Sequence, residues 1–388
     1  VTLLSLDLDS RELTKQTIVG SAESVYASEN AMYLSHTQYN YGYPVPMMGI
    51  AVREGTIAED PATGEPSPVT SNEIAGEGSL VHDVENPPSD STMVEPISID
   101  KPVPAPTIMD NRTYTIIHKF DLNNGRIEYV GKGKVLGHVL NQFSMDESKG
   151  FFRIATTTDA QWDQFGKEQT QQENNVFVLD AEMETVGTLD DLAPGEKIYS
   201  ARFMGDRAYL VTFKQVDPLF VIDLSDPTNP HVLGKLKIPG YSNYLHPIDE
   251  THLIGIGKDA EVSKEDFAYY LGMKLAIFDV SDVENPKLMH SLVVGDRGTD
   301  SPALYDHKAF LFDKEKELMV LPIQLSEITD SAKKEAEKGG WPAYGEPVFQ
   351  GAIAYHVSLK DGFEEIGKIT HIDDETNLKS GYYYDYAY

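Results

Sequence analysis

Residues 217–259 have the sequence DPLFVIDLSDPTNPHVLGKLKIPGYSNYLHPIDETHLIGIGKD, and this segment predicts four short strands. Residues 220–222 are an apolar run that is too short for a helix, and residues 231–238 alternate between apolar and polar side chains. Turn formers fill residues 226–230, because two prolines fix φ there and the Asp and Asn side chains bond readily to nearby backbone. We therefore expect two strands joined by a turn.

The second half of the segment predicts a hairpin. Residues 244–248 and 252–256 are strand-like runs, and Asp249-Glu250-Thr251 between them is a typical hairpin turn. Taken together, the four strands are expected to form one four-stranded antiparallel unit.

The same pattern recurs along the chain. Six strand-like runs end in Asp or in an equivalent position, namely Asp7, Asp121, Asp180, Asp223, Asp279 and Val357-Ser358. From the second run onward, most of the intervals are about forty to sixty residues, and a repeat near forty residues with four strands per unit is typical of a β-propeller. The sequence therefore predicts an all-β chain, a β-propeller of four-stranded antiparallel blades, with six units visible.

The repeats predict a single propeller domain over residues 1–388, because each blade buries its faces only against neighbouring blades. The domain is expected to be truncated at both ends, since Val1 and Tyr388 both fall within strand patterns. Residues 41–112 are predicted to be an acidic, proline-rich insertion between strands.

Two shorter insertions, at residues 260–272 and 326–348, are expected on one rim of the propeller. Each contains a segment with helix-forming residues, at 263–271 and at 329–338.

The composition narrows the classes of partner. The formal net charge is −30, with 62 acidic and 32 basic side chains, which argues against nucleic-acid binding because phosphate contacts need a cationic surface. Such acidity keeps a protein soluble and suits a salt-rich medium or divalent cations. The absence of cysteine excludes disulfides and thiolate chemistry. No apolar run reaches the length of a transmembrane segment.

Four stretches carry a resemblance to known proteins: QFSMDESKGFFRIATTT (142–158), LAPGEKIYSARFMGDRAYLVTFKQVDPLFVIDLSDPTNP (192–230), GYSNYLHPIDETHLIGIGKD (240–259) and LYDHKAFLFD (304–313). They closely resemble secreted archaeal and bacterial proteins with a C-terminal β-propeller distantly related to WD repeats. The phrase VIDLSDPTNP also resembles the LVIVD-type repeat of surface propellers. The resemblance implies an exported or cell-surface propeller of seven or eight blades when complete. The family has no assigned reaction, so the resemblance supplies no catalytic residues.

A ring of polar residues is the first candidate site. When the units are aligned at hairpin turns expected at Ser28-Glu29, Asp146-Glu147, Gly205-Asp206 and Asp249-Glu250, equivalent positions hold Ser24, Gln142, Arg202 and His246, with His307 and Ser380 nearby. These residues would surround one mouth of the central channel and hold an anionic or sugar ligand.

Two alternatives remain open for this ring. In the first, the side chains of the ring form hydrogen bonds to neighbouring strands and hold the blades together. In the second, a transition metal is bound by His246, His307 and Asp306.

The acidic turns are candidate Ca²⁺ sites, because Ca²⁺ prefers carboxylate and carbonyl oxygens. The candidates are Asp7-Leu8-Asp9, Asp223 with Asp226, Asp279 with Asp282, Asp296 with Asp300, and Asp373-Asp374-Glu375. Their spacing matches no known calcium loop, and an Asp after a strand often closes an Asx-turn instead. We therefore expect these turns either to bind structural Ca²⁺ or to be simple Asx-turns. We expect no organic cofactor.

No catalytic motif is evident, and Asn111-Arg112-Thr113 is a single N-glycosylation sequon. The sequence therefore favours a non-enzymatic extracellular or cell-surface scaffold for binding, adhesion or assembly, with a surface protein or polysaccharide as partner and with an oligomer or larger assembly as its context. The alternative is a hydrolase or lyase that acts on polysaccharide or peptide at the channel mouth.

Overall fold

The computed structural model describes residues 1–6, 8, 11, 13–40, 112–123, 126–162, 167–213, 217–262, 268–339 and 343–372. Residues Val1–Asn40 and Asn111–Tyr388 make up the first of two units of the chain, and Tyr41–Asp110 make up the second. The predicted insertion at 41–112 lies outside the described residues, except for Arg112. All of the described strands and helices belong to the first unit.

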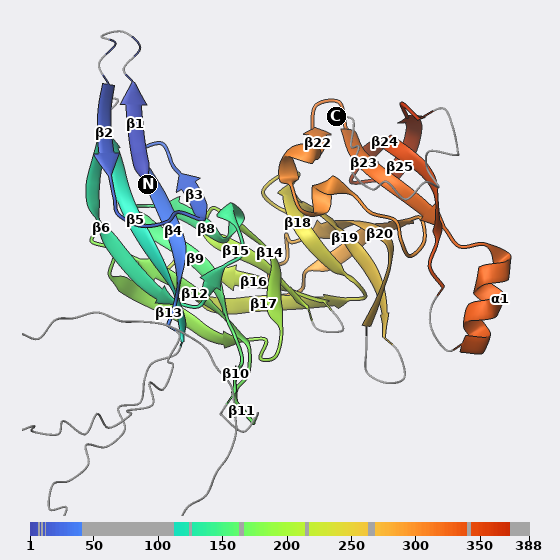
Figure 1. Ribbon diagram of the computed structural model, residues 1–388, viewed down its shortest axis with the longest axis horizontal. Helices are drawn as coiled ribbons and strands as arrows, with labels where there is room; N and C mark the ends of the chain where they lie inside the picture. The colour runs from blue at the N-terminus through green and yellow to red at the C-terminus, as the bar shows by residue number, and fades with distance from the viewer. Residues whose placement is uncertain are drawn as a thin grey trace, which may run out of the picture. The chain divides into compact units, whose positions relative to one another are not determined.

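Most of the described strands form five antiparallel sheets of four or five strands, which we call blades 1 to 5 (Figure 1). Blade 1 consists of β3 (Ser24–Ala27), β4 (Ala31–Tyr39), β5 (Thr113–Asn123) and β6 (Arg126–Leu136). Blade 2 consists of β8 (Met145–Ser148), β9 (Phe151–Thr158), β12 (Glu173–Leu179) and β13 (Thr185–Leu192), and β7 (His138–Val139) also pairs with β9.

Blades 3 to 5 have four strands each, in chain order. Blade 3 consists of β14 (Lys197–Met204), β15 (Arg207–Phe213), β16 (Asp217–Asp223) and β17 (His231–Ile238). Blade 4 consists of β18 (Tyr241–Pro247), β19 (His252–Val262), β20 (Ala268–Asp279) and β21 (Lys287–Val294). Blade 5 consists of β22 (Leu311–Asp313), β23 (Leu318–Glu327), β24 (Glu346–Ser358) and β25 (Gly362–Ile369).

Two separate hairpins complete the described strands. They are β1 (Thr2–Leu6) with β2 (Leu13–Thr17), which lies beside β6, and β10 (Gln161–Trp162) with β11 (Glu168–Thr170). The all-β propeller prediction is confirmed. The six repeated units correspond to six strand pairs: β1–β2, β5–β6, β12–β13, β16–β17, β20–β21 and β24–β25.

The predicted grouping of residues 217–259 into one four-stranded sheet is wrong. Strands β16 and β17 close blade 3, whereas β18 and β19 open blade 4. The reason is that the Pro239-Gly240 connection does not fold back as a hairpin. It carries the chain from the last strand of one blade to the first strand of the next, so that each repeated unit contributes to two neighbouring blades.

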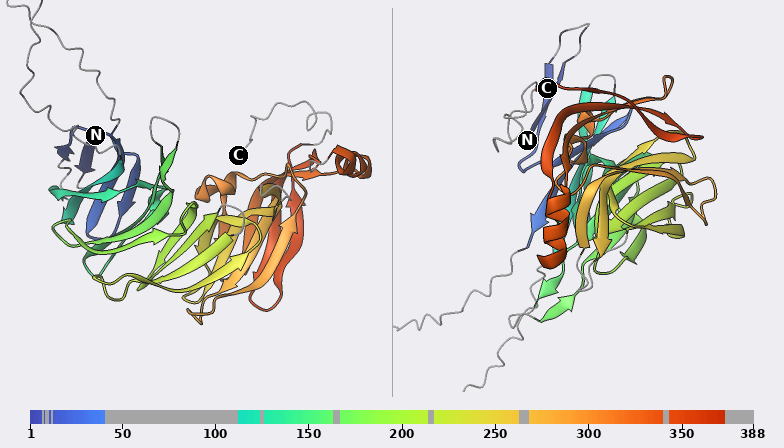
Figure 2. Two further views of the ribbon diagram at one scale, coloured as in Figure 1. Left: turned by 90° about the horizontal axis from the view of Figure 1, so that it is seen from below. Right: turned by 90° about the vertical axis from the view of Figure 1, so that its right-hand side faces the viewer.

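The core lies between successive blades, which follow one another in chain order (Figure 2). Strand β14 contacts β18, and β17 contacts β21, so blades 3 and 4 pack face to face. Their central strands are covered on both faces, and residues Leu219, Val221 and Ile254 are at most 1% exposed. Burial of such apolar runs stabilises the fold by about 25 cal/mol per Å² of apolar surface.

The two rim insertions differ from each other. Helix α1 (Asp330–Gly339) confirms the helix predicted at 329–338. The helix predicted at 263–271 is wrong over its described part, because residues from Ala268 onward belong to β20 and pair with the extended end of β19. Adjacent aromatic residues Tyr269 and Tyr270 suit a pleated strand at least as well as a helix. Residues 263–267 lie outside the described residues.

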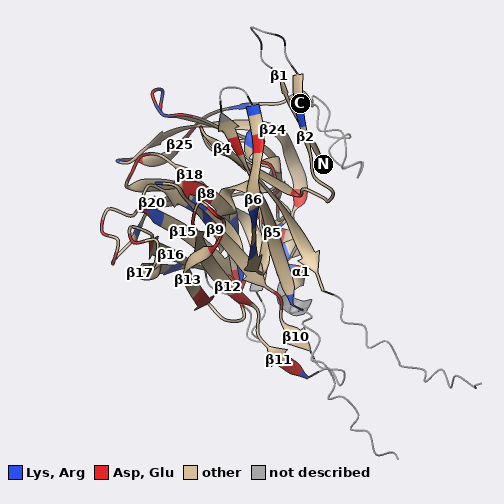
Figure 3. Cartoon of the chain, turned by 90° about the vertical axis from the view of Figure 1, so that its left-hand side faces the viewer, with Lys and Arg blue, Asp and Glu red and all other residues tan. Residues whose placement is uncertain are grey.

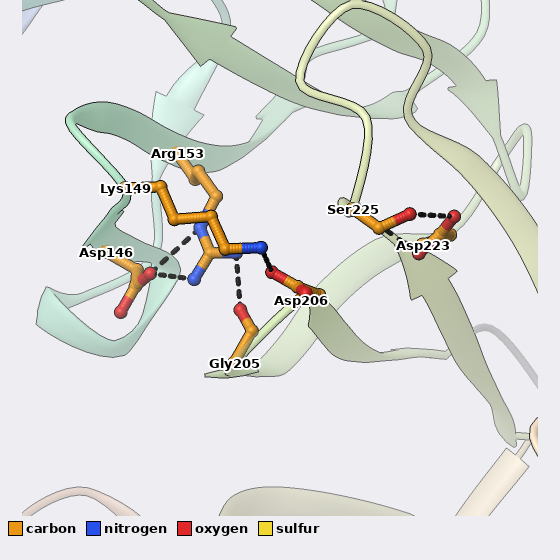
Figure 4. A network of polar contacts seen from close by, with 7 residues as sticks. All are labelled: Asp146, Lys149, Arg153, Gly205, Asp206, Asp223 and Ser225. Carbon is orange, nitrogen blue, oxygen red and sulfur yellow. Dashed lines mark hydrogen bonds and ion pairs between the residues drawn. The ribbon is translucent and has the colours of Figure 1, made fainter.

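Polar contacts between hairpin turns join blades 2 and 3 (Figure 4). Arg153 of β9 is only 3% exposed, forms an ion pair with Asp146 of β8 and donates to the carbonyl of Gly205 over 2.6 Å. On the surface, Lys149 pairs with Asp206 over 2.6 Å. These contacts show that polar side chains outside the predicted ring hold blades 2 and 3 together.

Candidate ligand-binding site

The turn that begins blade 2 is displaced from its predicted position. The β8–β9 hairpin turns at Lys149-Gly150, both with positive φ, and Asp146-Glu147 lie within β8. A two-residue turn of this kind favours glycine, so the Lys-Gly pair was the available sequence signal. As a result, Gln142 precedes β8, whereas Arg202 and His246 lie within β14 and β18. The four aligned positions are therefore not equivalent.

Two of the predicted residues, Arg202 and His307, nevertheless meet at Phe143, which was not among the predicted site residues. Phe143 lies in the 3-10 turn η1 (Gln142–Ser144), and Asn141 caps this turn by accepting from the Phe143 amide over 2.9 Å. The Phe143 ring centre lies 4.7 Å from that of His307 and 5.4 Å from that of Tyr244. The Arg202 guanidinium lies 5.0 Å from the same ring centre. Residues from blades 2 to 5 thus converge on one aromatic side chain.

Arg202 is a half-buried cation, and no ion pair with it is found among the described residues. Burial lowers the pKa of its guanidinium, although the group stays charged at neutral pH. Asp146 attracts it electrostatically. That carboxylate is already bound by the buried Arg153, so the two form a neutral pair and the positive charge of Arg202 is left over.

His246 is used in packing. Its Nδ1 lies 3.0 Å from the Tyr244 hydroxyl, and its ring centre lies 5.1 Å from that of Phe310 and 5.4 Å from that of Phe312. Burial, with a smaller effect of Arg202, lowers the pKa of His246 to about 4. The imidazole is therefore neutral at pH 7 and serves the contact between blades 4 and 5.

His307 and Gln142 touch directly, with 3.3 Å between the two Nε2 atoms. Because the Gln142 amide nitrogen donates, His307 Nε2 accepts, and the Gln142 amide oxygen remains for another donor. His307 Nδ1 lies 3.9 Å from the Asp306 carboxylate, which also accepts from the Lys308 amide. Within the described part of the chain, no three His, Asp or Glu side chains gather as a metal site would require.

Two cavities adjoin η1. The first, of about 390 Å³, we call the amide cavity, and its lining includes Ser24, Asn141, Gln142, Phe143, Asn243 and His307. The second, of about 340 Å³, we call the arginine cavity, and its lining includes Val25, Tyr26, Gln142, Phe143, Asp146 and Arg202. Both have the size of small-molecule sites. Thus Ser24, Gln142, Arg202 and His307 line one or both of these cavities, and His246 lines neither. Ser380 lies outside the described residues.

Most of the described aspartates of the acidic turns accept hydrogen bonds from residues two or three positions further along the chain. Asp223 accepts from Ser225, Asp226 from Thr228, Asp279 from Ser281, Asp282 from Asn285 and Asp296 from the Ile328 amide, while Asp300 pairs with Lys258. The contacts of Asp223, Asp226, Asp279 and Asp282 are the local Asx-type turns of the alternative interpretation, whereas Asp296 and Asp300 contact residues distant in sequence. Asp7, Asp9, residues 373–375 and the sequon asparagine, Asn111, lie outside the described residues.

Comparison with known proteins places the chain in a family. A model of the beta propeller domain matches residues 1–388. An uncharacterised protein of Methanocaldococcus jannaschii is 45% identical over 209 residues, which cover 54% of this chain and 30% of that protein. An uncharacterised protein of Archaeoglobus fulgidus is 40% identical over 208 residues, which cover 54% of this chain and 29% of that protein. The matched segments therefore span less than a third of either relative. Together with its sheets, the full-length match shows that this chain belongs to the beta propeller domain family.

Proposed function

We propose that this chain is a non-enzymatic binding module of an extracellular or cell-surface protein, and that its partner, a surface protein or polysaccharide, docks at the two cavities beside Phe143. The observation that carries the proposal is Arg202. A half-buried guanidinium that forms no ion pair among the described residues is unusual in a chain of net charge −30, and an incoming anion would neutralise it.

The carboxylates that line the cavities support binding over catalysis. Glu23 accepts from the Thr37 amide over 3.0 Å and from its hydroxyl over 2.7 Å, and Asp146 is bound by Arg153. A hydrolase that acts through paired carboxylates needs one that protonates the leaving group and another free to attack or to activate water. Both carboxylates of these linings already have partners, so the hydrolase or lyase is the second candidate.

The extracellular location rests on the resemblance to secreted propellers and on the strong acidity. Acidic segments are scattered over the blades in Figure 3 rather than gathered on one strand. In the described part of the chain, no helix is long and apolar enough to cross a membrane. Surface labelling of intact cells of the source organism tests this location, and recovery of the protein only from unlabelled fractions would contradict it.

Calcium stabilisation stays a prediction of the sequence. Thermal unfolding with calcium, and then with excess chelator at matched ionic strength, tests it, because a ligand of the folded state raises the midpoint. A chelator-reversible rise would support a structural ion. An unchanged midpoint would remove calcium from the account and leave the binding proposal intact.

A screen of glycans and peptides against the purified chain tests the binding function, with mass spectrometry of each ligand after incubation. Retention of a ligand whose mass is unchanged supports the proposal. Time-dependent cleavage or elimination products would instead support the enzyme, and an absence of binding across the screen would overturn the binding module.

A further inference from the structure

We propose that the ligand is an acidic sugar residue of a polysaccharide, with its carboxylate bound by Arg202 in the arginine cavity and its hydroxyls bound in the amide cavity. This inference rests on the binding function proposed above and adds the chemical class of the ligand.

The arginine cavity supplies a site for one negative charge. Arg202 is the single Lys or Arg in the described lining of either cavity, and the nearby negative charge of Asp146 is balanced by its ion pair with Arg153. A guanidinium presents a planar fork of N–H donors that matches a carboxylate. With one cation available, the site suits a monoanionic carboxylate better than a doubly charged phosphate.

The amide cavity supplies donors and acceptors for hydroxyl groups. The side-chain oxygen of Asn243 is buried with no hydrogen-bond partner among the described residues, and an unpaired buried acceptor is costly until a donor reaches it. The Gln142 amide oxygen, beside His307, also has no hydrogen-bond partner within the described part of the chain. Sugar hydroxyls both donate and accept, so they satisfy such groups.

Charge also fixes the orientation of the ligand. Glu23 lines the amide cavity, and its carboxylate would repel a second carboxylate but would accept a hydrogen bond from a hydroxyl group. The acid group therefore belongs in the arginine cavity.

Aromatic rings flank both positions. Phe143 lines the two cavities, and Tyr305, which is 78% exposed, lines the amide cavity. Aromatic side chains of this kind offer an apolar face to the C–H face of a sugar ring. An extended acidic peptide would use Arg202 but would have little use for the hydroxyl-matching groups of the amide cavity.

Calorimetric titration with trigalacturonate tests the proposal, against its methyl ester and a short polyglutamate peptide. Arg202→Gln removes the charge, and Lys235→Gln is the matched control, because Lys235 is exposed on β17 at the opposite edge of the same blade. We expect Arg202→Gln to weaken trigalacturonate binding roughly tenfold or more, while Lys235→Gln leaves it unchanged. Esterification should weaken binding to the wild type by a similar factor and should have little further effect on Arg202→Gln.

A second variant, Gln142→Leu, tests the amide cavity and keeps the experiment informative when Arg202→Gln unfolds. This variant should weaken the binding of trigalacturonate and of its methyl ester by a similar factor. Equal binding of acid and ester to the wild type would overturn the acidic sugar and leave the binding module standing. If polyglutamate binds more tightly than trigalacturonate and its binding depends on Arg202, the acidic sugar is also overturned, and the partner is a peptide. If trigalacturonate does not bind but the wider screen yields another ligand, the acidic sugar alone is wrong; if that screen is also empty, the binding module fails too.

Discussion

The guanidinium of Arg202 lies over the ring of Phe143, 5.0 Å from its centre, although the two residues belong to different blades. Phe143 reaches this position from a 3-10 turn that precedes the first strand of blade 2. The contact holds the cation beside both cavities, and it makes one half-buried aromatic side chain important for stability as well as for the proposed site.

Removal of the Phe143 ring should therefore destabilise the protein. We expect Phe143→Ala to lower the free energy of unfolding by about 2 kcal/mol, below the 3–5 kcal/mol typical of a fully buried Phe. Urea denaturation measures the change. The matched control is Trp162→Ala, since Trp162 is 59% exposed and should cost little. Equal losses in the two variants would show that Phe143 has no special packing role.

The buried ion pair of Arg153 and Asp146 should matter more than the exposed pair of Lys149 and Asp206. Asp146→Asn leaves a buried guanidinium with the Gly205 carbonyl as its remaining partner, which should cost about 3 kcal/mol. Asp206→Asn breaks an exposed pair and should leave the urea midpoint unchanged within error. A comparable shift in both variants would contradict the assignment of Arg153 to the clamp between blades 2 and 3.

His246 should make stability depend on pH. Its pKa is about 4 in the folded protein against an ordinary value of 6.5, so the unfolded chain binds more protons between these values. The contribution is therefore fully present above pH 6.5 and is lost as the pH falls towards 4. Unfolding free energies across this range should fall less steeply for His246→Gln than for the wild type, and identical slopes would place His246 in a solvated environment.

Gly257 in β19 has no room for a side chain. A Cβ atom there would lie 1.7 Å from the carbonyl oxygen of Tyr241, which is backbone and cannot move independently. Gly257→Ala should therefore destabilise the fold by about 1–3 kcal/mol or prevent folding. Gly367→Ala in β25 is the control, because nothing lies within 4 Å of its added Cβ. A stable Gly257→Ala protein would show that β18 and β19 are farther apart than described.

The blades could be predicted from the sequence because their signals are local. Apolar runs, Asp-Pro turns and hairpins such as Asp249-Glu250-Thr251 repeat along the chain, and each is set by neighbouring residues. The assignment of strands to sheets depends on where each connection leads the chain, and no local pattern marks the division between β17 and β18. At Lys149-Gly150 the turn signal is present in the sequence, but the acidic pair Asp146-Glu147 just before it is an equally typical turn, and the prediction places the turn there.

The candidate site was predicted in part, for a different reason. Gln142, Arg202 and His307 stood out as polar residues near the expected first strands, and the structure brings them together. Phe143 carries no repeated pattern, so its central position emerges only when blades 2 to 5 are assembled. His246 shows the converse, because a histidine that suggests ligand binding in the sequence is surrounded by Tyr244, Phe310 and Phe312.

The most direct measurement of the central claim is a crystal structure of the chain with bound trigalacturonate. The account predicts a carboxylate within hydrogen-bond distance of the Arg202 guanidinium and sugar hydroxyls at Gln142 and Asn243. A ligand bound elsewhere on the blades, or cavities that stay empty at saturating ligand, would contradict it.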